Sequence, residues 1–122
     1  MITGAHSIIY SMEPEKDRDF IREVLKFPRI DAGGGWLIFG LPPSEVAVHP
    51  ARKNNVHELY LMCDDIEELA SEMKSLKIRC SKVQKQPWGL LVTLRLPGGG
   101  DLGVYQPLHL RPRSVKVKAR KR

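Results

Sequence analysis

The sequence predicts an α+β fold in which one unit, strand–helix–strand–strand–strand, occurs twice. In each half an amphipathic helical segment follows a short β-rich run, at 14–27 and again at 66–76. Two stretches rich in glycine and proline, Gly34–Pro50 and Pro87–Pro107, also resemble each other in sequence. Neither half has enough elements to cover both faces of its sheet, so we expect the two halves to pack together.

The first half is predicted to begin with a strand at 5–11, because this run is rich in β-forming residues. Pro14 suits the first turn of a helix over 14–27, and Pro28 ends that helix. Three strands are predicted to follow, at 29–32, 36–41 and 45–49. A polar connection then leads to the second half.

The second half repeats this order, beginning with a strand at 58–63. Asp64 or Asp65 is predicted to cap the next helix, and Glu67 and Glu68 in its first turn suit the positive end of the helix dipole. The apolar face of this helix consists of Ile66, Leu69, Ala70, Met73 and Leu76. Three strands are predicted to follow, at 79–85, 89–96 and 101–106.

Composition favours a single globular domain, since the chain has 122 residues of which 42% are hydrophobic. No apolar run reaches the roughly 20 residues that cross a bilayer, so no membrane association is expected. The first residues lack the pattern of a secretion signal. Cys63 and Cys80 are too few for a disulfide framework, and together these features predict a cytoplasmic protein.

The positive charge of the chain is concentrated at its C-terminal end. Seven of the 20 Lys and Arg residues lie in 111–122, which leaves 13 basic against 14 acidic groups in residues 1–110. The sequence therefore predicts one domain over 1–110 followed by a basic disordered tail over 111–122. The alternative role of the tail is contact with nucleic acid, because clustered cations release counterions from phosphates.

Four segments resemble the vicinal oxygen chelate superfamily, which includes glyoxalase I, bleomycin-resistance proteins and extradiol dioxygenases. They are AHSIIYSME with His6, the helix DRDFIREVLKF, the run HELYLMCDDIEEL, and the stretch that begins PWG and ends LPGGGDLGVYQP. The resemblance implies two βαβββ modules, at 4–52 and 56–108, whose curled mixed sheets surround a cavity. It also implies a homodimer.

Metal-dependent members of that superfamily take one ligand from the first and one from the last strand of each module. On this pattern the first-strand positions are His6 and Glu58, although His57 is only one residue away and a shift of one residue would turn it to the cavity instead. The last-strand positions hold Ala47 and Gly103, which cannot bind a metal. The resemblance therefore implies a degenerate site.

His49 and Tyr105 lie two residues beyond these small residues, so each should face the same way as its small neighbour. His6, His49 and Glu58 form a candidate set of two histidines and one carboxylate for Fe, Mn, Ni or Zn. In the alternative reading His6 and Glu58 bond to each other or to a ligand. His49 is a candidate base, Tyr105 a candidate hydrogen-bond donor to a substrate, and Trp36 and Tyr105 are candidate ligand contacts.

Two hypotheses about function remain open from the sequence. In the first, the protein is a glyoxalase-like or dioxygenase-like enzyme that acts on a small molecule, with a divalent metal at the degenerate site. In the second, it binds a small molecule without metal or catalysis, as bleomycin-resistance proteins do. The vacant carboxylate positions at Ala47 and Gly103 favour the second, and the retained His6 and Glu58 favour the first.

Overall fold

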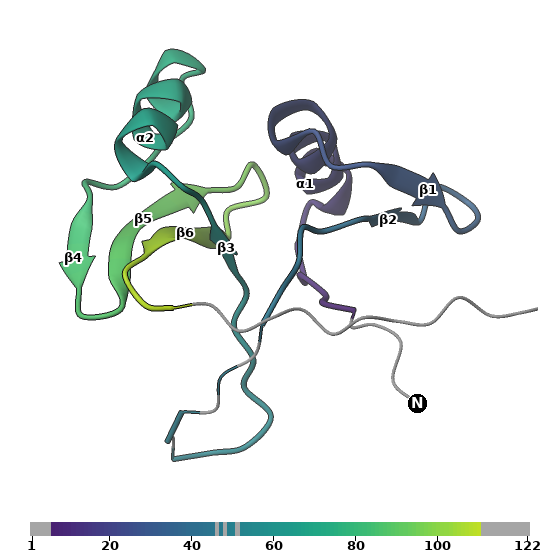
Figure 1. Cartoon of the computed structure of the whole chain (residues 1–122). Coiled ribbons are helices and arrows are strands. Elements are labelled where there is room, and N and C mark those ends of the chain that lie inside the picture. Colours follow the sequence, from purple (N-terminus) through teal and green to yellow (C-terminus); the bar gives the residue numbers. More distant parts are fainter. Residues whose placement is uncertain (1–5, 46, 48, 51, 111–122) are drawn as a thin grey trace, which may run out of the picture.

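The structure is a computed structural model that describes residues 6–110 except 46, 48 and 51, and Figure 1 shows the course of the chain. Its elements in chain order are α1 (Pro14–Phe20), the π-helical turn η1 (Ile21–Leu25), β1 (Arg29–Asp31), β2 (Leu37–Phe39), β3 (Tyr60–Met62), α2 (Ile66–Ser75), β4 (Gln84–Gln86), β5 (Gly89–Arg95) and β6 (Asp101–Pro107). The predicted α+β class is confirmed.

The second half forms a four-stranded mixed sheet in the order β3–β6–β5–β4. Strand β3 runs parallel to β6, while β5 is antiparallel to both of its neighbours. This connectivity is that of one βαβββ module, because α2 follows the first strand and three strands come after it. Strands β1 and β2 form a separate antiparallel sheet in the first half.

Local signals explain where α2 begins and ends. The side chain of Asp65 accepts a hydrogen bond from the backbone N–H of Glu68 at 3.1 Å, so of the two predicted caps it is Asp65 that caps the helix. The helix ends at Ser75, and Lys77 then takes a left-handed conformation with φ of 60°. The apolar face between these ends turns to the sheet.

The helix predicted at 14–27 is present as α1 followed by η1. Pro14 stands at the start of α1, where its missing N–H costs nothing. Lys26 closes the second turn in a left-handed conformation with φ of 59°, and Pro28 prevents continuation.

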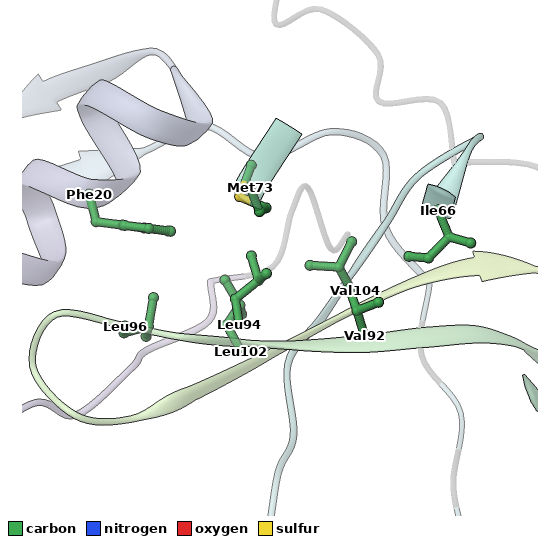
Figure 2. Packing of buried hydrophobic residues seen from close by; sticks show 8 residues of the cluster. All are labelled: Phe20, Ile66, Met73, Val92, Leu94, Leu96, Leu102 and Val104. Carbon is green, nitrogen blue, oxygen red and sulfur yellow. The ribbon is translucent and has the colours of Figure 1, made fainter. Parts of the chain in front are cut away.

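One hydrophobic core lies between the four-stranded sheet and the two helices, as Figure 2 shows. Its buried members are Phe20, Ile66, Met73, Val92, Leu94, Leu96, Leu102 and Val104. Phe20 comes from α1 in the first half, and it packs with side chains of α2 and the sheet in the second half. The two halves therefore share a core.

A hydrogen bond reinforces this junction. Asp17 of α1 is buried, and its Oδ1 accepts from the backbone N–H of Gly98 in the β5–β6 turn at 2.7 Å. A Cβ at position 98 would lie 2.5 Å from Ser11 Oγ and 2.6 Å from Asp17 Oδ2. Glycine at this position therefore lets the turn approach α1 closely.

The first half is less complete as a sheet than the predicted module. Residues 6–11, which belong to the predicted strand 5–11, have no regular structure, and Tyr10 is 90% exposed. A strand needs a partner for its backbone groups, and the described part of this segment pairs with no strand. The predicted strand at 45–49 includes residues 46 and 48, which lie outside the described residues, and residues 45, 47 and 49 have no regular structure.

The predicted basic tail at 111–122 lies outside the described residues. Among residues that the structure does describe, no helix combines the length and the apolar character needed to cross a membrane.

Candidate functional site

The four-stranded sheet has one face turned to the helices and one turned away from them. Val92, Leu94 and Val104 point into the core, so their alternating neighbours on β5 and β6 point to the opposite side. The register places Tyr60 opposite Gly103 and Gly103 opposite Thr93 on that side. We call this side, which also carries Met62, Leu91 and Tyr105, the aromatic face.

Three aromatic side chains contact one another on the aromatic face. The ring centroids of Trp88 and Tyr105 are 5.0 Å apart, and Tyr60 lies 6.1 Å from each of them. The rings are close to perpendicular, with interplanar angles of 68°, 84° and 89°, which is the favourable edge-to-face arrangement. Tyr60 is 41% and Trp88 37% exposed, so this ring cluster presents aromatic surface to solvent.

Two glycines make room for the ring cluster. A Cβ at Gly103 would lie 2.5 Å from Cδ1 and Cε1 of the Tyr60 ring. A Cβ at Gly89 would lie 2.7 Å from Cδ2 of Tyr105. The absence of side chains at both positions therefore permits the observed seats of Tyr60 and Tyr105. This gives a physical reason for glycine at 103, where the resemblance places a metal-binding carboxylate in other proteins.

Glu58 belongs to the same face and adds a negative charge to it. The hydroxyl of Tyr60 donates to Glu58 Oε2 at 2.8 Å. This hydrogen bond, with smaller contributions from burial and from the charge of Glu58, raises the pKa of Tyr60 above its ordinary value of 10.0. Glu58 thus reaches the ring cluster through the Tyr60 hydroxyl.

Tyr105 has a polar partner that the sequence did not single out. Its hydroxyl lies 3.1 Å from Nε2 of His109. Nδ1 of His109 lies 2.8 Å from the carbonyl oxygen of Leu110, so Nδ1 carries the hydrogen and Nε2 accepts from Tyr105 in the neutral ring. Glu45 Oε1 is 3.7 Å from the same Nε2. Tyr105 and His109 are four positions apart in the sequence. That spacing does not predict a contact when the chain between them is extended.

The ring cluster adjoins an open hollow of ≈ 550 Å³ at the ends of β3 and β6. Met62, Cys63, Asp64, Gln106, Pro107 and His109 line it. The hollow is broadly open to solvent, and none of its lining residues belongs to the ring cluster itself.

The candidate metal ligands do not come together within one chain. His6, His49 and Glu58 are all exposed. Among the described residues, which include these three, no group of three His, Cys, Asp or Glu side chains is placed to hold a metal ion. The residues of the described chain thus do not form the predicted donor set, and we derive no metal-dependent step from them.

Trp36 and Tyr105, the two candidate ligand contacts, lie in different parts of the fold. Trp36 stands at the start of β2 and is 69% exposed. The guanidinium carbon of Arg18 lies 5.4 Å from its ring centroid, a cation–π contact between the β1–β2 turn and α1. Tyr105 instead contacts the rings of Tyr60 and Trp88, besides His109.

The two cysteines are free and half-buried. Burial raises the pKa of both thiols above the ordinary value of 9.0, and the nearby carboxylates add to this effect at Cys63. Both groups are therefore less nucleophilic at neutral pH than an exposed thiol.

The fold of this chain is similar to that of two solved structures, and it is the fold that the resemblance to the vicinal oxygen chelate superfamily implies. TnmS3, an antibiotic-binding protein from Streptomyces sp. CB03234, is 20% identical, and the alignment covers 88% of this chain and 98% of that one at a TM-score of 0.63. Lactoylglutathione lyase from Agrobacterium tumefaciens is 16% identical, with coverage of 85% and 92% and a TM-score of 0.57.

No family model matches the sequence, and no curated protein matches it significantly. At these identities the two structural neighbours establish the fold, while ligand and activity have to be argued from the residues of this chain.

Proposed function

We propose that this protein binds a small molecule on its aromatic face and that it does so without catalysis. The observation that carries the proposal is the seat of the Tyr60 ring over Gly103, where a Cβ would approach ring carbons to 2.5 Å. A side chain of any size at this position would displace the ring. The chain therefore uses the position for aromatic surface, and aromatic surface is what binds apolar ligands.

The neighbour TnmS3 supports the proposal, because it is an antibiotic-binding protein and its whole length aligns with this chain. A contiguous patch of exposed apolar surface also commonly marks an interaction site. The ring cluster of Tyr60, Trp88 and Tyr105 is the part of the aromatic face best suited to that role.

A set of ring variants tests the proposal by thermal shift and calorimetry against a panel of aromatic natural products. Ligands that raise the melting temperature of the wild type should lose this effect in Tyr60→Ala and Trp88→Ala. Trp36→Phe is the control, since Trp36 is exposed and precedes β2, outside the ring cluster. If Trp36→Phe abolished binding and Trp88→Ala preserved it, the binding site would lie at Trp36 and not at the ring cluster.

A catalytic function remains the second candidate for this protein, because the other structural neighbour is a lactoylglutathione lyase and Glu58 lies on the aromatic face. In that case Tyr105 would donate a hydrogen bond to the substrate, His49 would act as base, and His6, His49 and Glu58 would have to meet in an arrangement that the single described chain does not have. Metal analysis after expression with added Fe, Mn, Ni or Zn decides between the candidates. Stoichiometric metal that disappears in His6→Ala would favour the enzyme.

We further propose that the protein is a homodimer. The segment 8–12 carries apolar side chains in water, including Tyr10 at 90% and Met12 at 96% exposure. A second copy that pairs with this segment would bury these side chains and would satisfy its backbone groups. A location in the cytoplasm stays a prediction from the sequence.

A further inference from the structure

The aromatic face carries an asymmetric charge. Arg95 and Asp101 face each other across β5 and β6 and form an ion pair at 3.0 Å, so their charges cancel. The neutral side chains of Gln84 and Gln86 occupy β4 on this side. Glu58 has no basic partner among the ion pairs of the described residues, and its hydrogen-bond partner is the neutral hydroxyl of Tyr60. The ring cluster therefore has an uncompensated carboxylate at its edge.

The geometry of the ring cluster suits a flat ligand with a positive charge. Three nearly perpendicular rings let a planar molecule stack on one ring face while the other rings contact its rim. The face of an aromatic ring is electronegative and attracts cations. Glu58 adds a full negative charge close to the Tyr60 hydroxyl, at 2.8 Å. An anionic ligand of the same shape would be repelled by that carboxylate.

We propose that the ring cluster and Glu58 together select planar aromatic cations over neutral and anionic molecules of the same shape. This inference rests on the proposed binding function and names the class of ligand for it. Stacking on Tyr60 and Trp88 supplies affinity, and Glu58 supplies discrimination by charge. No covalent step is involved.

Three probes with one ring system test the inference by isothermal titration calorimetry near pH 8. They are 9-aminoacridine, which is a cation, acridine, which is neutral, and acridine-9-carboxylate, which is an anion. The cation should bind most tightly and the anion most weakly. Glu58→Gln keeps an acceptor for the Tyr60 hydroxyl and removes the charge, so it should weaken the cation about fivefold, the upper end for an exposed charge pair, and leave acridine unchanged.

Two further variants locate the effect. Glu67→Gln removes an exposed carboxylate from the first turn of α2, on the helix side of the sheet, and should leave all three affinities as they are. Tyr60→Phe keeps the ring and loses the bond to Glu58, and Tyr60→Ala loses both. Acridine should therefore tolerate Tyr60→Phe and lose affinity in Tyr60→Ala, and melting curves check that each variant is folded.

The outcomes separate the inference from the proposed function. Equal affinity for the three probes, or a Glu58→Gln protein that binds the cation as the wild type does, would overturn the selection of cations and leave binding on the aromatic face intact. Cation binding that is insensitive to both Tyr60→Ala and Trp88→Ala would place the probe elsewhere and overturn it as well. Failure of every probe to bind would count against the ring cluster as a binding site and thus against both.

Discussion

The ring of Tyr60 on β3 lies directly over the Cα of Gly103 on β6, so that a Cβ at 103 would meet ring carbons at 2.5 Å. This contact between neighbouring parallel strands couples Tyr60 to position 103, which the resemblance considered only as a ligand position. Strand β3 supplies Tyr60, the segment that leads into it supplies Glu58, and β6 supplies the gap into which Tyr60 fits. The aromatic face depends on this match of a large and a small residue.

Gly103→Ala is expected to destabilise the protein by about 1–3 kcal/mol, since the new methyl group forces Tyr60 out of its seat. In a Tyr60→Ala background the same substitution should cost less, because the clash is gone. Urea denaturation of the wild type, both single variants and the double variant gives the coupling free energy. Strictly additive effects would show that the two residues do not interact.

Tyr60 is expected to ionise at higher pH than an ordinary tyrosine. Its pKa is raised because the neutral hydroxyl donates to Glu58 Oε2. A folded-state pKa above the unfolded value contributes stability that is fully present below pH 10.0 and is lost as pH rises through the folded pKa.

The phenolate absorbance of the folded protein should therefore include one tyrosine that titrates late, and Glu58→Ala should shift it down toward 10.0. Tyr60→Phe identifies the late component by its loss. A titration without a component that ionises above 10.0 would contradict the bond between Tyr60 and Glu58.

Asp17→Ala is expected to cost about 1–3 kcal/mol of unfolding free energy, because it leaves the N–H of Gly98 without its buried acceptor. Asp19→Ala is the matched control on the same helix, where Asp19 is exposed and pairs with Arg22 at 2.8 Å. That change should cost about 0–1 kcal/mol. Similar losses in the two variants, measured by urea denaturation, would argue against Asp17 as the link between α1 and the β5–β6 turn.

Sedimentation equilibrium is expected to give twice the mass of the 13.8 kDa chain at micromolar concentration. Replacing Ile8 and Tyr10 by Ser should shift the equilibrium toward the monomer, because these exposed side chains are proposed to be buried by the second copy. Serine at the exposed Leu76 on α2 serves as the control. A wild type that sediments as a monomer would refute the dimer.

The sequence by itself determined the periodic part of this protein. Helical spacing of apolar residues and the prolines at 14 and 28 located the helices, and alternating apolar residues located β5 and β6. Such signals are local, because a helix or a strand shows its buried side as a repeat along its own residues. The α+β class followed from the order of these elements, and the glyoxalase-like arrangement was what the resemblance implied.

Only the tertiary structure decided how the site is composed. It joined Tyr60, Trp88 and Tyr105 from separate segments, turned Glu58 toward them, added His109 and placed Trp36 in the β1–β2 turn. The physical reason is that contacts across strands depend on register, and register is set by pairing between residues far apart in the sequence, such as Tyr60 with Gly103. A linear sequence carries no local mark of which large side chain will fill the space above a distant glycine.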